Sequence, residues 1–214
     1  MKKVFGVIGL GKFGFYVAKT LAEAGAEVIA IDKDEDKIRK ISDLVTHAYL
    51  ADALEEQSLE EAGILSADTV VISIGENIEA SILVTMLLIG RGIKEVIAKA
   101  VSPLHGEVLK RLGVARVVYP EKEIATRLAR SLLVTGVLEE IPFAPGHSIF
   151  EIKAPINLIN RTLKEADLRR RYGINVLAIK RGNKVIVNPS AEEKILKGDV
   201  LLILGSEESL LTLS

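Results

Sequence analysis

Short apolar runs alternate with longer amphipathic segments over the first part of the chain. The apolar runs predict six strands, at 3–9, 27–32, 46–52, 68–75, 94–100 and 115–120. Helical patterns lie between them, at 17–25, 33–42, 55–63, 77–92 and 103–113. Runs such as KVFGVIG have no polar face, so these strands are expected to be buried on both sides. The alternation predicts an α/β fold with a doubly wound parallel sheet and helices on both faces.

The pattern changes after residue 120. One helix is predicted for 121–137, and IPFAPG (141–146), with two prolines and a glycine, is interpreted as a linker. A segment HSIFEIKAP, a helix at 162–173 and three short strands at 174–182, 184–189 and 199–205 follow, with KRGNK as a hairpin turn. We therefore expect a domain at 1–120, a crossover helix and linker at 121–146, and a small α+β domain at 147–214.

The stretch GVIGLGKFG places three glycines between the first strand and the first helix. Gly9, Gly11 and Gly14 have the G-x-G-x-x-G spacing of a Rossmann-like dinucleotide fold, in which a helix N-terminus faces the phosphates. Asp32 closes the second strand, where a carboxylate accepts ribose hydroxyls and disfavours a 2′-phosphate. The alternative is a glycine turn that only packs a helix. Loop and carboxylate together favour a bound nucleotide.

Further candidates follow from the same topology, because ligands bind at the carboxyl ends of parallel strands. Asp52 ends the third strand, either near an adenine or as the N-cap of the next helix. Lys12 is either a phosphate contact or a solvated lysine, and Lys99, in an apolar strand, needs a partner or an anion. The predicted nucleotide contacts are Gly9, Leu10, Gly11, Lys12, Phe13, Gly14, Asp32, Lys33, Asp52, Ala53, Ser73, Ile74, Gly75 and Lys99.

Composition narrows the classes of function. A formal net charge of −1 argues against nucleic acid as a partner. The absence of cysteine excludes disulfides and thiolate chemistry. The apolar stretch at 82–90 is far shorter than the roughly 20 residues that span a bilayer. MKK leads directly into the first strand, so we expect a cytoplasmic protein that reaches a membrane only through another protein.

A catalytic set is not evident. His47 is expected to be structural, His105 solvated, and His147 opens the second domain, and none lies in a suggestive motif with a carboxylate. The nucleotide is therefore expected to be a ligand, and no residue is assigned as catalytic. A small NAD-dependent oxidoreductase relying on Lys99 or His105, and a free-standing nucleotide sensor, stay open. The apolar helices at 80–90 and 125–138 indicate either deep core or subunit interfaces.

Several motifs in order resemble one family over nearly the whole chain. They are GVIGLGKFG, THAYLADALEE, VVISIGENIEAS, VIAKA, LGVARVVYPEKEIA and DLRRRYGINVLAIKRGNKVIVNPS with GDVLLILG. Together they resemble the RCK (regulator of potassium conductance) subunits of bacterial potassium transporters, of the KtrA/TrkA type. The resemblance implies a cytosolic homo-oligomeric ring beneath a membrane potassium-conducting subunit of the KtrB/TrkH type. Binding of ATP or ADP, or of NAD(H), would change the shape of the ring.

The resemblance also implies roles for single residues. Lys12 corresponds to a basic residue that meets the γ-phosphate across a dimer, where the family often has arginine. Glu121 corresponds to an acidic residue beside the phosphates, where Mg²⁺ or another divalent cation sits. Some relatives bind cyclic di-AMP in the C-terminal domain, and the corresponding positions include Arg169, Asn175 and Pro189. At Lys164 relatives often have an apolar residue in that second site.

Overall fold

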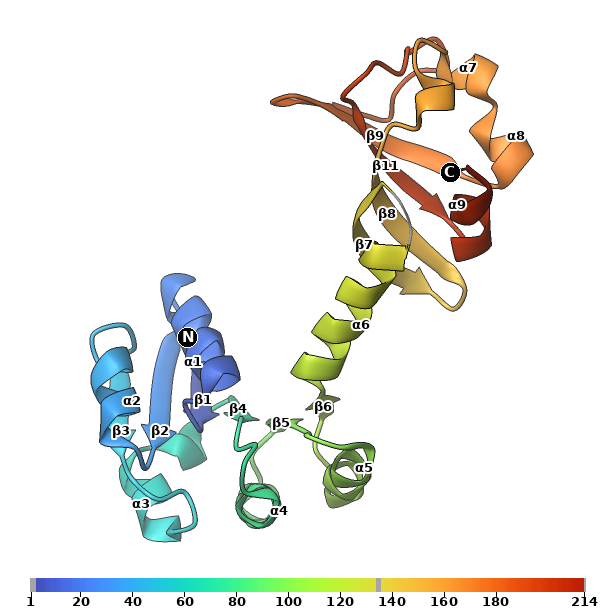
Figure 1. Ribbon diagram of the computed structural model, residues 1–214. Helices are drawn as coiled ribbons and strands as arrows, with labels where there is room; N and C mark the ends of the chain where they lie inside the picture. Colours follow the sequence, from blue (N-terminus) through green and yellow to red (C-terminus); the bar gives the residue numbers. More distant parts are fainter. Residues whose placement is uncertain (1–2, 134–135, 214) are drawn as a thin grey trace. The chain divides into compact units, whose positions relative to one another are not determined.

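The computed structural model describes residues 3–133 and 136–213. Its contacts divide the chain into two compact units that separate between Pro120 and Glu121. Each unit has its own sheet and its own apolar core (Figure 1). Within the described residues, no helix is both long enough and apolar enough to cross a membrane.

The first unit is the expected doubly wound α/β fold. Its sheet has six parallel strands in the order β3-β2-β1-β4-β5-β6. The strands are β1 (Val4–Ile8), β2 (Glu27–Asp32), β3 (His47–Leu50), β4 (Thr69–Ile72), β5 (Glu95–Lys99) and β6 (Arg116–Val118). The helices are α1 (Lys12–Glu23), α2 (Glu35–Ile41), α3 (Glu56–Glu61), η1 (Ile64–Ser66), α4 (Ile78–Gly90) and α5 (Pro103–Leu112).

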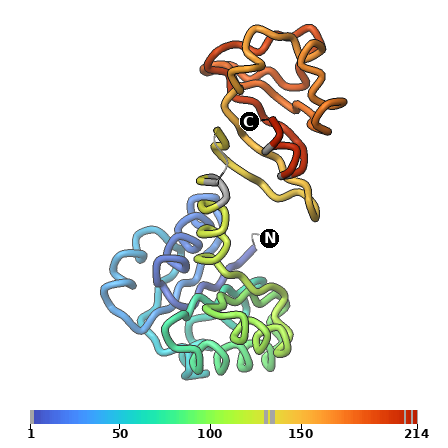
Figure 2. The backbone as a smooth tube through the Cα atoms, turned by 45° about the vertical axis from the view of Figure 1, so that its right-hand side comes forward, coloured from blue at the N-terminus to red at the C-terminus, as the bar shows by residue number. Residues whose placement is uncertain are grey.

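Successive strand residues supply two cores on opposite faces of this sheet. In β1, Val7 packs in the cluster beneath α1 and α2, and Ile8 packs in the cluster beneath α4 and α5. The side chains of a strand point alternately to its two faces, which explains why the predicted strands are apolar throughout. Figures 1 and 2 show the helices on both sides of the sheet. The predicted fold class is therefore confirmed.

The second unit contains a five-stranded antiparallel sheet in the order β10-β9-β11-β8-β7. The strands are β7 (Val137–Ala144), β8 (His147–Lys153), β9 (Asn175–Arg181), β10 (Lys184–Val187) and β11 (Val200–Gly205). The helices are α6 (Pro120–Leu133), η2 (Ile156–Leu158), α7 (Leu163–Ala166), α8 (Leu168–Tyr172) and α9 (Glu207–Leu213). The predicted hairpin turn at KRGNK joins β9 to β10.

The interpretation of 141–146 as a linker is wrong. These residues belong to the β7–β8 hairpin, in which Ile141 pairs with Ile149 and Pro142 with Ser148. Strand β7 lies at the edge of the sheet, and the register shifts between Pro142 and Ala144. An edge strand with a bulge tolerates a proline, because no ladder hydrogen bond is lost. A proline-rich stretch therefore does not exclude a strand.

Two predicted helices also differ from the structure. The helix expected at 121–137 ends at Leu133, residues 134–135 lie outside the described residues, and Val137 already belongs to β7. The helix expected at 162–173 is two short helices, α7 and α8. Asp167 between them has a φ of 44°, which interrupts the helical hydrogen-bond pattern. A periodic apolar pattern alone does not reveal such a break.

Candidate functional site

The candidate site lies at the carboxyl edge of the first sheet. Strand order reverses between β1 and β4, which is where ligands bind in open α/β sheets. The loops that follow these strands are tied to one another by backbone hydrogen bonds. The Gly9 N–H donates to the Ile31 carbonyl (2.8 Å), and the Ser73 N–H donates to the Ile8 carbonyl (2.7 Å). The residues predicted after β1, β2 and β4 are therefore held side by side.

Each of the three positions in the loop requires glycine for a different structural reason. Gly9 has a φ of 90°, which side chains rarely adopt. A Cβ on Gly14 would lie 1.9 Å from the Gly9 carbonyl oxygen, so only glycine lets α1 begin this close to β1. A Cβ on Gly11 would meet nothing within 4 Å. Gly11 therefore leaves open space in front of the helix, as a backbone approach to a phosphate requires.

The N-terminus of α1 presents its backbone amides without a side-chain cap. Gly11 is the N-cap residue and makes no capping hydrogen bond, and the first turn holds no acidic residue. Lys12 is exposed, whereas Leu10 and Phe13 pack against the core beneath α1. The side chains of Leu10 and Phe13 thus position the loop, and its open backbone and Lys12 are the groups that suit an anion.

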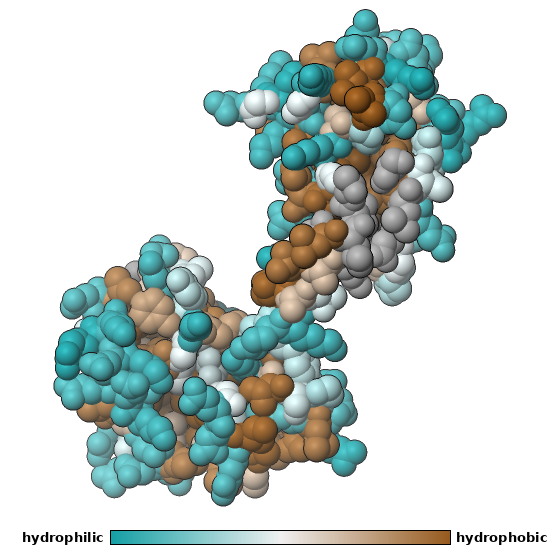
Figure 3. Space-filling model, in the orientation of Figure 1, coloured by the Kyte–Doolittle hydropathy of each residue, from teal (hydrophilic) through white to brown (hydrophobic). Residues whose placement is uncertain are grey.

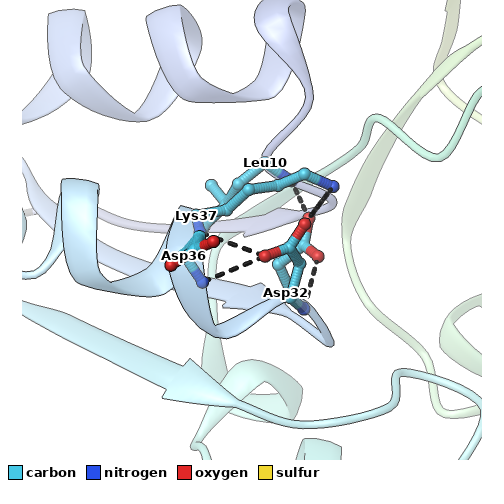
Figure 4. Close-up of polar contacts among 5 residues, drawn as sticks. Leu10, Asp32, Asp36 and Lys37 are labelled. Atoms are coloured by element: carbon cyan, nitrogen blue, oxygen red, sulfur yellow. Dashed lines mark hydrogen bonds and ion pairs between the residues drawn. The ribbon is translucent and has the colours of Figure 1, made fainter.

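Asp32 is buried, and its carboxylate organises the neighbouring loops (Figure 4). Oδ2 accepts a 2.6 Å hydrogen bond from the Leu10 N–H, and Oδ1 accepts one of 2.9 Å from the Asp34 N–H. The Lys37 ammonium lies 3.5 Å from Oδ2. The carboxylate therefore joins the glycine loop to the start of α2, and it lies where a ribose binds in this fold.

Lys33 and Asp52 both line an open depression of about 320 Å³ beside Asp32. Its other lining residues are Leu50, Ala51, Glu55 and Ser58. Asp52 is not the N-cap of α3, because its Oδ1 accepts from the Leu54 N–H in a local turn and Glu55 is the N-cap residue. Ala53 is buried in the core and supports this wall from behind.

The end of β4 closes the other side of the glycine loop. Ser73 is buried, and its hydroxyl has no hydrogen-bond partner within the described part of the chain. A Cβ on Gly14 would also lie 3.0 Å from the Ser73 Cβ, which places this residue against the start of α1. Ile74 is half-buried. Lys99 reaches across from β5, because its Nζ lies 3.4 Å from where a Cβ on Gly75 would be.

His105 is buried, so the prediction that it is solvated is wrong. Its Nδ1 accepts a 3.4 Å hydrogen bond from the Val101 N–H, and Nε2 has no partner within the described residues. Burial lowers the pKa of this imidazole, so it is neutral at pH 7. At the next residue, Gly106, a Cβ would lie 1.7 Å from the Tyr119 hydroxyl, so the Tyr119 ring packs against this turn of α5. His47, at the start of β3, is exposed.

Outside the first unit, the predicted ligand residues lie on the surface. Glu121 is exposed in the first turn of α6. No group of three His, Asp or Glu residues within the described ranges could hold a metal ion. In the second unit, Arg169 on α8 and Asn175 at the start of β9 are exposed, and Pro189 follows β10. The sequence reasoning missed Lys37, although its place one turn after the N-cap Asp34 is a usable signal.

Comparisons with known proteins agree with this architecture. Residues 5–120 match the TrkA-N domain family, and residues 147–214 match the TrkA-C domain family. The chain is 42% identical over 206 residues to Ktr system potassium uptake protein C of Bacillus subtilis, which covers 96% of this chain and 93% of that protein. It is 33% identical to Ktr system potassium uptake protein A of Vibrio alginolyticus, covering 97% of this chain and 94% of the relative.

Solved structures share the fold. The GsuK channel bound to NAD superposes with a TM-score of 0.65 at 15% identity, covering all of this chain and 39% of that one. A Kef C-terminal domain of Shewanella denitrificans in an AMP-bound form gives a TM-score of 0.54 at 22% identity, with 61% and 80% of the two chains covered. From the family matches and the Ktr relatives, we conclude that this chain belongs to the RCK family of proteins with a TrkA-N and a TrkA-C domain, together with the Ktr potassium uptake proteins.

Proposed function

We propose that this protein is a cytosolic, nucleotide-gated regulatory subunit of a potassium uptake system. One observation carries the nucleotide part: an open glycine loop and a buried, hydrogen-bonded carboxylate lie at the switch point of the sheet. The potassium part rests on the Ktr relatives, which match over almost their full length. Residues 1–120 then form the nucleotide-binding domain, and residues 147–214 form the second domain.

An adenine nucleotide suits the chemistry along the carboxyl edge. The phosphates would meet the open backbone at Gly11 and the cation of Lys12. The ribose hydroxyls would donate to Asp32. The adenine would enter the depression that Lys33, Leu50 and Asp52 line. Asp32 serves any unphosphorylated ribose, so ATP, ADP and NAD(H) all fit this set of contacts, and the solved GsuK channel holds NAD on the same fold.

The described residues around this edge favour a nucleotide that binds as a regulatory ligand over one that reacts as a substrate. An oxidoreductase would need an acid or a base beside the nicotinamide. His105 is buried and neutral, with one ring nitrogen taken by the Val101 N–H, so it is not a proton carrier for a ligand in the crevice. The Lys99 ammonium lies beside Gly75 at this edge, where its charge suits an anionic ligand. The oxidoreductase is therefore the weaker alternative.

Regulation would follow from differential affinity. A ligand changes the shape of an assembly only if it binds one shape more tightly than another. Lys12 and Glu121 are both exposed charged residues, so a second copy of the chain can approach them. A γ-phosphate that contacts such charges from two copies would distinguish ATP from ADP. A divalent cation at Glu121, and cyclic di-AMP at Arg169, Asn175 and Pro189, stay predictions of the family resemblance.

Calorimetric titration of nucleotide-stripped protein with ATP, ADP and NADH, with and without Mg²⁺, tests this proposal. We expect ATP and ADP to bind tightly to the wild type. Lys12→Ala and Glu121→Gln should each lower the affinity for ATP about tenfold more than the affinity for ADP, because only ATP carries the γ-phosphate. Lys19→Ala, further along α1, is the control and leaves both affinities unchanged. If only NADH binds, or if the two substitutions lower the affinities for ATP and ADP equally, the hypothesis of ATP gating is rejected. A redox sensor or an oxidoreductase would then be the favoured function.

The partner is tested separately. We expect the protein to co-purify with a potassium-conducting membrane subunit of the KtrB/TrkH type and to lie at the inner face of the membrane through that contact. If nucleotide binds but neither co-purification nor vesicle potassium flux depends on the protein, the chain is a free-standing nucleotide sensor.

A further inference from the structure

Lys37 places a cation beside the buried carboxylate of the candidate site. It lies in the first turn of α2, and its ammonium is 3.5 Å from Asp32 Oδ2 and 3.6 Å from Asp34 Oδ2. The Lys37 side chain is 40% exposed, whereas that of Asp32 is only 7% exposed. Figure 4 shows the Lys37 side chain extended from α2 over Asp32, toward the Leu10 end of the glycine loop.

This contact differs from the other ion pairs of the same helix. Arg39 pairs with Glu35 at 3.2 Å, and both side chains are about 70% exposed (71% and 72%). Such pairs in solvent contribute little to stability. Lys37 instead reaches a carboxylate that is shielded from water and belongs to the ligand edge of the sheet. Its position is therefore of interest for binding as well as for the fold.

The hydrogen bonds of Asp32 leave limited room for a ribose diol. An ionised carboxylate offers about four acceptor positions, two on each oxygen. Oδ1 already accepts from the Asp34 N–H and keeps one position. Oδ2 accepts a short bond from the Leu10 N–H and has the Lys37 ammonium at its second position. One ribose hydroxyl can therefore donate to Oδ1, and a second hydroxyl meets the ammonium of Lys37.

We propose that Lys37 and Asp32 form a donor–acceptor pair that recognises both hydroxyls of the nucleotide ribose. A hydroxyl can act as a donor or as an acceptor, so one ribose hydroxyl donates to Asp32 Oδ1 and the oxygen of the other accepts from the Lys37 ammonium. A hydrogen bond to a charged donor is stronger than a neutral one. Lys37 is thereby a specificity-determining residue for the ribose. This inference rests on the proposed nucleotide binding.

A ligand–variant cycle tests the pair. The affinities of ADP and 2′,3′-dideoxy-ADP are measured by calorimetry for the wild type, Lys37→Met, Lys37→Arg and Lys40→Met. Lys40→Met is the matched control, because it removes the same charge from the same helix at an exposed position. The preference for ADP over the dideoxy analogue is expected to fall about fivefold or more in Lys37→Met. Lys37→Arg should retain most of the preference, and Lys40→Met all of it.

The outcomes separate this inference from the proposed function. If the wild type binds ADP and Lys37→Met keeps the full preference, Lys37 does not read the ribose, and only this inference fails. A drop of equal size for both ligands in Lys37→Met also overturns it, because that result reports charge or folding alone. If the wild type binds no adenine nucleotide, the proposed function fails and takes the inference with it. Thermal unfolding of each nucleotide-free variant shows that the fold is intact.

Discussion

Two glycines three positions apart in the same loop meet opposite steric environments. A Cβ at Gly14 would lie 1.9 Å from the Gly9 carbonyl oxygen, whereas a Cβ at Gly11 would meet nothing within 4 Å. Gly11 also has an ordinary φ of −61°. The motif spacing alone does not distinguish these cases. The structure assigns Gly14 to the packing of α1 and leaves Gly11 facing the open space of the candidate site.

Substitution of these two glycines should therefore separate folding from binding. Gly14→Ala is expected to lower the free energy of unfolding by about 2 kcal/mol or more, because the methyl group overlaps backbone that cannot easily move. Gly11→Ala should change it by less than about 1 kcal/mol, yet weaken nucleotide binding by filling the space that a phosphate needs. Urea unfolding and ADP titration measure the two effects. Equal destabilisation by both variants would contradict this assignment.

An ion pair between Arg181 at the end of β9, whose side chain is 32% exposed, and the buried Asp199 joins β9 to the residue before β11. Arg181 donates from Nε to Asp199 Oδ1 (2.9 Å) and from a terminal nitrogen to Oδ2 (2.8 Å), and also contacts Glu193. The Asp199 side chain is almost fully buried. The Leu196 N–H also donates to Asp199 Oδ2, so the pair holds the loop before β11 against the sheet. Both oxygens of the carboxylate are thus satisfied, as a buried charge requires.

Removal of this charge should loosen the second unit in a pH-dependent way. Hydrogen bonds from Arg181 hold the pKa of the Asp199 carboxyl below its ordinary value of 3.8. A lowered pKa in the folded state means that the stabilisation is complete above the unfolded-state pKa and is lost as the pH falls through the folded-state pKa. Asp199→Asn should cost roughly 2–3 kcal/mol at pH 7, measured by hydrogen exchange of the β9 and β11 amides.

The cost of this substitution should shrink as the pH falls below about 4 toward the folded-state pKa, because the unfolded wild type takes up a proton in this range and the folded wild type does not. Glu192→Gln provides the control, because Glu192 and its partner Lys164 are both more than 70% exposed (72% and 71%). That variant should leave exchange of the same amides unchanged at every pH. If the loss of unfolding free energy in Asp199→Asn stays constant from pH 7 to pH 3, the ionised carboxylate of Asp199 is not what stabilises this part of the second unit.

At the level of elements, the sequence predicts the first unit better than the second. Apolar runs that alternate with helices ending in glycine predict a parallel sheet. The topology of such a sheet then predicts that ligands bind at the carboxyl ends of its strands. The β7–β8 hairpin was missed because Pro142 and Gly146 are typical of loops, and only the edge position of β7 permits them in a sheet. The burial of His105 is not predicted either, because it depends on the contacts that the fold makes around α5. Contacts between distant residues leave no local pattern.

On the scale of the whole molecule, helix α6 exposes apolar side chains on its surface. Ile124, Leu128 and Leu132 are 55%, 58% and 77% exposed and recur every four residues along α6. This spacing puts them on one face of the helix. Figure 3 shows apolar surface along α6. Helix α4 likewise exposes Leu83 and Met86. The part of the expected 125–138 helix at residues 134–135 lies outside the described residues.

An exposed apolar helix face indicates an interface, and we propose that a second copy of this chain covers the α6 face. The double variant Ile124→Glu/Leu128→Glu should weaken self-association about 30-fold or more, because a two-fold symmetric contact buries each unpaired carboxylate twice. Thr126→Glu is the control, since Thr126 lies on the opposite side of α6 and gains a charge of the same sign. Sedimentation velocity across a concentration series measures the change. If the double variant keeps the wild-type mass, another surface, such as that of α4, holds the copies together. An α6 contact would then not bring Lys12 of one copy and Glu121 of another to the same γ-phosphate.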